Sequence, residues 1–290
     1  PIKSSAASDV YKRQSFNEII AKGYGEPQSA KEFAELAQWV NYDGHRSLFE
    51  SRSQNRKGLL MWMSHSCWPS MVWQTYDYYF EPTAAYFAIK KASEPLHIQW
   101  NPATDEVEVV NYSAGTHKGL TAKVQILNMD ASVAWEKEAT VDSNEDTTNK
   151  CIKLAFPANL SKVHFIKMVL TENGKVVSDN FYHRSLEENN YQDLRQLAKV
   201  ALQSTTTVDK NADGTWSAVS VIENKTSTPA LMIRLNVVGS KDGQQLLPVF
   251  YSDNYFSLLP GEKKEVRMSW KDEDTRGNEG KVLITGYNVE

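Results

Sequence analysis

The sequence predicts an α/β segment followed by two all-β sandwiches of immunoglobulin type. Helical periodicity and one short, purely apolar run are confined to residues 15–95. After residue 95 the chain consists of short strand-like runs separated by turn signals, among them Asn173-Gly174, a strong hairpin signal. We therefore expect an α/β segment over residues 15–95, one sandwich over residues 96–186 and a second over residues 187–290.

Residues 29–51 carry the signals of a helix. Ser29 is followed three residues later by Glu32, which is the pattern of a capping box. Apolar residues then recur at helical spacing from Phe33 to Val40, and they resume at Leu48 after a possible break. One amphipathic helix is the interpretation that uses all of these signals.

The rest of the α/β segment is predicted to contain one strand and a second helix. Residues 58–63, Gly-Leu-Leu-Met-Trp-Met, suit a fully buried parallel strand. Pro82 suits the first turn of a helix, and Pro95 would stop it. Helix, buried strand, long loop and helix amount to one and a half β/α units, which an α/β barrel or a doubly wound sheet would contain.

Strand-like runs fill the two predicted sandwiches. Seven runs lie between residues 97 and 185, and seven more lie between residues 198 and 289. Seven short strands in about ninety residues are typical of an immunoglobulin-like sandwich. The Cys…Trp…Cys spacing of antibody domains is missing.

Composition excludes several classes of function. The chain of 290 residues is 41% hydrophobic and 23% charged, as expected for a globular protein. Its net charge of −4 gives no electrostatic reason to expect a nucleic acid or an anionic membrane as partner. Phosphate-loop, Gly-x-Ser-x-Gly and Cys-x-x-Cys motifs are missing, and we expect no cofactor and no metal. Cys67 and Cys151 are not expected to form a disulfide.

The beginning of the chain is unusual. Residues 1–14 have no usable periodicity, and neither an initiator methionine nor a signal peptide is present. We expect these residues to be an artefactual leader and exclude them from fold reasoning.

Residues 61–82 hold three tryptophans, three tyrosines and one phenylalanine. Within them, the pattern Trp62-x5-Trp68-Pro69-x3-Trp73, followed by Asp77-Tyr78-Tyr79, resembles the eighth barrel strand and helix entry of family 2 glycoside hydrolases. That family includes β-mannosidases, β-galactosidases and exo-β-glucosaminidases. The order of a barrel end and two sandwiches resembles the C-terminal part of the same enzymes, with the closest likeness to the exo-β-glucosaminidase and β-mannosidase branch.

The resemblance implies that residues 15–95 are the last units of a (β/α)₈ barrel. It also implies a retaining exo-β-glycosidase, in which an acid and a nucleophilic carboxylate stand about 5–5.5 Å apart. In the family these groups lie on barrel strands four and seven. We expect strand four to lie upstream of residue 1, so this chain alone should be inactive. Glu18 is the one nearby candidate nucleophile, but its surroundings suit a helix with a solvated carboxylate better.

The resemblance and the position of barrel active sites single out Trp62, His65 and Trp68 as substrate-binding residues. An indole ring offers a flat apolar face to the carbon-bound hydrogens of a sugar. His65 could donate to a sugar hydroxyl. The alternatives are core packing for the indoles and a structural role for His65. Asp77 is expected to cap a turn, and the tyrosines after it to pack against the first sandwich.

This chain departs from the family at one place. Where many members have Gln-x-Asn-Asp, it has Met63-Ser64-His65-Ser66. The identity of the sugar therefore stays open, and the expected partner is an oligosaccharide or glycoconjugate. We expect the parent enzyme to act in the periplasm or outside the cell.

A non-catalytic carbohydrate-binding or adhesion module is the alternative function. In that case exposed tryptophans on the sandwiches, Trp135, Trp216 or Trp270, would bind glycans. Their positions on strand-like runs favour core packing instead.

Overall fold

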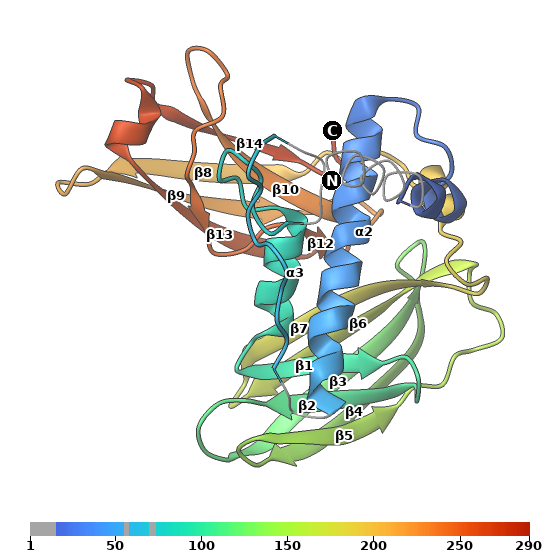
Figure 1. Cartoon of the computed structure of the whole chain (residues 1–290). Coiled ribbons are helices and arrows are strands. Elements are labelled where there is room, and N and C mark those ends of the chain that lie inside the picture. Colours follow the sequence, from blue (N-terminus) through green and yellow to red (C-terminus); the bar gives the residue numbers. More distant parts are fainter. Residues whose placement is uncertain (1–15, 55–57, 70–73) are drawn as a thin grey trace, which may run out of the picture.

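The computed structural model describes residues 16–54, 58–69 and 74–290 (Figure 1). The proposed leader, residues 1–14, lies outside the described residues. Figure 1 shows two helices, α2 and α3, running side by side, with one β-sandwich beneath them and a second beside their upper ends. Within the described residues, no helix is long and apolar enough to cross a membrane.

The first long helix, α2, spans Ala30–Glu50, as the sequence predicts. Its N-cap is Ser29, whose hydroxyl accepts a hydrogen bond from the backbone N–H of Glu32 at 3.1 Å. The Glu32 carboxylate accepts from the backbone N–H of Gln28 at 2.6 Å, one residue before the position that a standard capping box uses. These contacts satisfy N–H groups that have no partner inside the helix. A short 3₁₀ turn, η1 (Ser51–Gln54), follows.

The second helix, α3, spans Ala84–Ala92, as expected, but Pro82 lies just before the N-cap residue Thr83 and not in the first helical turn. Small buried alanines on one face let it approach α2 closely. The backbone N–H of Ala84 donates to Oε1 of Gln38 on α2 at 2.8 Å. The start of α3 is therefore held by a side chain of α2.

The prediction of a buried strand over residues 58–63 is wrong. These residues form no strand, and the side chains of Leu60 and Trp62 are 100% and 81% exposed. A strand buried in a parallel sheet needs hydrogen-bonded neighbours. No described segment pairs with residues 58–63. Their backbone therefore forms no hydrogen bonds to a neighbouring strand, and their side chains are not packed in a sheet core. The helices agree with the predicted α/β segment, whereas its described residues form no part of a barrel sheet.

The first sandwich contains seven antiparallel strands, which correspond to the seven predicted runs. Three form the sheet β1-β2-β5 and four form the sheet β4-β3-β6-β7. The strands are β1 (Leu96–Asn101), β2 (Glu106–Asn111), β3 (His117–Asn128), β4 (Val133–Ser143), β5 (Thr147–Lys153), β6 (Val163–Glu172) and β7 (Lys175–Ser185). This three-plus-four arrangement is of the immunoglobulin-like type.

Strict alternation along β3 explains how the sandwich forms its core. Leu120, Ala122, Val124 and Ile126 are fully buried, and the residues between them are not. The turn between β6 and β7 has positive φ angles at Asn173 and Gly174, 51° and 76°. Such angles are those of a type I′ hairpin turn, which confirms the predicted hairpin.

The second sandwich also contains seven strands in sheets of four and three. The sheets are β11-β13-β9-β8 and β12-β10-β14. The strands are β8 (Gln203–Lys210), β9 (Thr215–Glu223), β10 (Ala230–Gly239), β11 (Phe250–Tyr251), β12 (Phe256–Leu258), β13 (Lys263–Lys271) and β14 (Gly280–Thr285). Two 3₁₀ turns, η2 (Gln192–Gln196) and η3 (Asp272–Thr275), lie before β8 and after β13.

One hydrophobic cluster joins the helices to both sandwiches. Leu36 of α2, Phe87 of α3, Phe165 of β6 and Leu231 of β10 all belong to it and are almost fully buried. Because the members of this cluster come from both helices and both sandwiches and bury one another, the helices and the sandwiches hold each other in place.

Candidate functional site

The aromatic segment, residues 58–82, is a loop whose two arms are held together by hydrogen bonds. The Thr75 hydroxyl and the Tyr76 N–H both donate to the carbonyl of Ser64, at 2.8 and 3.1 Å. His65 and Tyr76 form an isolated β-bridge. These contacts hold the two arms together where they meet, although the described residues of the segment form no regular strand.

Polar contacts fix the far end of the aromatic segment. The carboxylate of Asp77 accepts from the backbone N–H groups of Tyr79 and Glu81 at 2.8 and 2.9 Å, which confirms the turn-capping role predicted for it. Glu81 pairs with Arg234 and accepts from Asn236 at 3.1 Å, both on β10. The aromatic segment is therefore attached to the second sandwich, and both of these carboxylates are occupied with structural contacts.

The predicted sugar-binding indoles lie on the surface. Trp62 is 81% and Trp68 64% exposed, so neither belongs to the core. Tyr78 and Tyr79, which we expected to pack against the first sandwich, are also exposed and contact each other edge to face. Several exposed aromatic side chains are thus gathered in one short segment of the chain.

His65 lies between this surface and the interior. Its ring stacks on Phe80, with 4.6 Å between centroids and 16° between planes. Its Nε2 atom is shielded from solvent and has no hydrogen-bond partner among the described residues. His65 therefore brings an unused polar atom next to an exposed aromatic ring.

Of the other residues singled out in the sequence, Glu18 and Cys151 lie outside this segment, whereas Cys67 and Trp73 belong to it. Glu18 is exposed on a helix over residues 16–24, as its helical surroundings predicted. Cys67 is exposed, Cys151 is half-buried, and both are free thiols. Trp73 lies outside the described residues.

The tryptophans of the sandwiches pack into the protein. Trp270 is almost fully buried and stacks parallel to Trp216, whose Nε1 donates to Asp272 at 2.7 Å. Trp135 packs against the core of the first sandwich. These contacts agree with the core-packing interpretation, and among the described residues the exposed indoles are those of Trp62 and Trp68.

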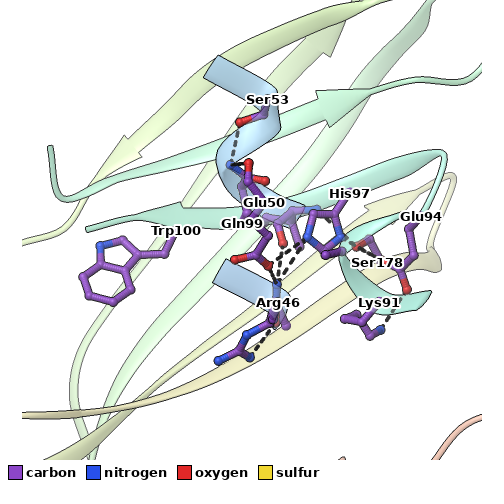
Figure 2. A network of polar contacts seen from close by, with 12 residues as sticks. Arg46, Glu50, Ser53, Lys91, Glu94, His97, Gln99, Trp100 and Ser178 are labelled. Atoms are coloured by element: carbon purple, nitrogen blue, oxygen red, sulfur yellow. Dashed lines mark hydrogen bonds and ion pairs between the residues drawn. The ribbon is translucent and has the colours of Figure 1, made fainter. Parts of the chain in front are cut away.

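A buried polar network lies where α2 meets the first sandwich (Figure 2). His97 of β1 lies between two carboxylates, with Nε2 3.1 Å from Glu50 and Nδ1 3.1 Å from Glu94. Glu50 also accepts from Asn180 at 2.8 Å and from the Tyr182 hydroxyl at 2.9 Å. These groups satisfy one another's hydrogen-bonding capacity, so the network fixes the helix on the sandwich. Because His97 is only 1% exposed, no substrate can reach the network.

Charge within the network affects the pKa of His97. Burial on its own would lower that pKa, but hydrogen bonds to Glu50 and Glu94 outweigh burial and raise it. The pKa of Glu94 shifts in the opposite direction: burial would raise it, whereas His97 and Lys91 together lower it. Sequence reasoning missed this network. The one local signal was the polar pattern Glu94-x-x-His97-x-Gln99, which begins before β1 and continues along it.

Fold and site together define a protein with two immunoglobulin-like sandwiches and a loop of exposed aromatic residues. Residues 180–289 match the immunoglobulin-fold domain of exo-β-D-glucosaminidases. An exo-β-D-glucosaminidase of Hypocrea jecorina is 30% identical over 316 residues, which cover 99% of this chain and 35% of the relative. One from Streptomyces avermitilis is 31% identical and aligns with 94% of this chain and 34% of its own length.

A solved structure agrees with these sequence matches. The crystal structure of the Amycolatopsis orientalis exo-chitosanase CsxA superposes with a TM-score of 0.89 at 30% identity, over 95% of this chain and 36% of that one. The chain is therefore similar over most of its length to exo-β-D-glucosaminidases, which confirms the resemblance found in the sequence. It spans about a third of the length of these relatives.

Proposed function

We propose that this chain is part of a retaining exo-β-glycosidase that removes terminal β-linked sugars, with β-glucosaminides as the preferred substrates. The observation that carries the proposal is that similarity to exo-β-D-glucosaminidases extends over 99% of the chain, aromatic segment and sandwiches alike. The names of these relatives favour a glucosaminide over a mannoside or galactoside. The helices of residues 16–95 would then belong to a catalytic (β/α)₈ barrel.

In this proposal the aromatic segment forms one wall of the sugar-binding site. Trp62 and Trp68 are exposed and can stack on the carbon-bound hydrogens of a pyranose ring. Nε2 of His65 has no hydrogen-bond partner among the described residues and would bind a sugar hydroxyl once it is open to solvent.

The described part of the chain offers no suitable acid and nucleophile beside the aromatic segment. A retaining glycosidase needs two carboxyl groups about 5–5.5 Å apart. Asp77 caps a turn, Glu81 pairs with Arg234, and Glu18 lies on an exposed helix. We therefore propose that the catalytic pair comes from outside this chain. We also propose that the complete enzyme acts in the periplasm or outside the cell.

Hydrolysis assays test the proposal. The purified 290-residue chain and the complete product of its gene would be compared on 4-nitrophenyl β-D-glucosaminide, β-D-mannoside and β-D-galactoside. We expect the complete protein to hydrolyse the glucosaminide fastest and the chain alone to stay at background. Turnover by the chain alone would contradict its inactivity. A complete protein that binds glycans but hydrolyses none of the three would instead support the binding-module alternative.

A further inference from the structure

A polar cleft lies between the two sandwiches, on the side of α2 and α3. Its volume is about 480 Å³, which is within the usual range for small-molecule sites, and it lies at a domain interface, where such sites are common. Tyr42 of α2, Phe181 of β7 and Phe256 of β12 are among its lining residues. The cleft shares no described lining residue with the aromatic segment, so it is a separate feature of the chain.

Three ion pairs line the cleft, and each is partly open to solvent. Lys91 lies 2.8 Å from Asp179, and Lys264 lies 2.5 Å from Asp253. The third pair, Lys167 with Glu262, joins the first sandwich to the second. The exposed fractions of these six side chains range from 16% to 47%. Each pair therefore keeps unused donor and acceptor capacity that faces the cleft.

The charges in the cleft balance. Among its described lining residues are four lysines and four carboxylate side chains. Burial would raise the pKa of Asp179, but Lys91, Lys264 and Lys167 outweigh burial and lower it to about 2. Lys91 contacts the Asp179 carboxylate directly, whereas the charges of Lys264 and Lys167 act on it from their own ion pairs. An anion could bind the lysines only by displacing the carboxylates that pair with them. A cation could likewise bind the carboxylates only by displacing the lysines.

An uncharged polyhydroxylated ligand avoids this competition. One hydroxyl of a vicinal pair can accept from an ammonium group while its neighbour donates to the carboxylate of the same ion pair. The apolar face of the ligand would contact the half-buried rings of Tyr42 and Phe181. We propose that the cleft between the sandwiches binds an uncharged saccharide unit through these paired contacts.

A filling substitution with a matched control tests the proposal. Val176 lines the cleft and is 62% exposed, so Val176→Trp would fill the cleft without disturbing the core. Its neighbour Val177 is 36% exposed and is not among the residues that line the cleft, so Val177→Trp is the control. Lys264→Gln, which removes one charge at the rim, is a second test that does not depend on steric filling. Circular dichroism would check that all three variants fold.

The full 290-residue chain would be titrated with cellobiose, N,N′-diacetylchitobiose and the cationic dimer of glucosamine, by calorimetry and by amide chemical shifts. We expect saturable shifts at Tyr42, Val176 and Asp253 with the two neutral disaccharides. Val176→Trp should weaken this binding by at least about tenfold, Lys264→Gln should weaken it severalfold, and Val177→Trp should leave it unchanged. Absence of saturable shifts, unchanged affinity of Val176→Trp, or tighter binding of the cationic dimer would each overturn the proposal. None of these outcomes bears on hydrolysis by the complete enzyme.

Discussion

Nε2 of His97 lies 3.1 Å from Oε1 of Glu50, and both side chains are almost completely removed from solvent. The contact ties β1 of the first sandwich to the last turn of α2, across 47 positions of sequence. Since Glu94 holds the other ring nitrogen, a protonated His97 is flanked by two acceptors. This arrangement makes the attachment of the helices to the sandwich dependent on pH.

The first prediction concerns that pH dependence. The pKa of His97 in the folded chain is raised above its ordinary value of 6.5. The contribution of His97 to the free energy of unfolding is therefore complete below pH 6.5 and is lost as the pH rises through the folded-state pKa. We expect the stability advantage of the wild type over His97→Gln, measured by urea denaturation, to shrink from pH 5.5 to pH 8.5.

His164 provides a control of opposite sign. Burial lowers its pKa, so the unfolded chain takes up a proton more readily than the folded chain does. The advantage of the wild type over His164→Gln should therefore grow as the pH rises from 5.5 to 7.5. Parallel trends for the two variants would contradict the assignment of opposite pKa shifts.

A second prediction concerns Glu50. Glu50→Ala removes the acceptor shared by His97, Asn180 and Tyr182 and leaves these buried groups without it. We expect a loss of about 3–5 kcal/mol in the free energy of unfolding, as is typical when one partner of a buried pair is removed. Glu35→Ala on the same helix is the matched control. The Glu35 carboxylate is half-exposed and lies 3.9 Å from Lys31, so its loss should cost less than about 0.5 kcal/mol. Equal effects of the two variants would show that the network contributes nothing.

Two glycines are expected to respond in opposite ways to substitution by alanine. Gly44 lies inside α2, and an added Cβ there would meet nothing within 4 Å. Gly44→Ala should raise the free energy of unfolding by about 1 kcal/mol because alanine favours the helix. At Gly280 an added Cβ would lie 2.4 Å from the indole of Trp270, so Gly280→Ala should cost about 1–3 kcal/mol. Thermal unfolding followed by circular dichroism distinguishes the two; a destabilising Gly44→Ala would count against the helix as described.

The fourth prediction concerns the exposed indoles. Trp62→Ala and Trp68→Ala should change the stability of this chain by less than about 0.5 kcal/mol, because both side chains are exposed. In the complete enzyme, Trp62→Ala should lower kcat/KM for the β-glucosaminide by about tenfold through loss of stacking on the sugar. Leu60→Ala, at a fully exposed position of the same segment, should leave kcat/KM unchanged. A Trp62→Ala enzyme with full activity would rule out the proposed stacking.

The sequence predicted the local structure well where local signals decide it. Ser29 and Glu32 marked the start of α2, and Asn173-Gly174 marked the turn between β6 and β7. Both signals act through backbone groups a few residues away, so no distant contact is needed to interpret them. Alternation along β3 likewise predicts which side chains enter a core, because successive residues of a strand face opposite sides of the sheet.

The sequence by itself thus determined the two helices, the fourteen strand-like runs and the family resemblance. Tertiary structure decided the rest. The run at residues 58–63 looks buried from its composition but is exposed, because burial of a strand depends on neighbours elsewhere in the chain. Glu50, His97 and Asn180 look like surface residues but are buried together, across as many as 130 positions of sequence. A polar group can be buried only beside its partners, and only the folded chain shows which partners those are.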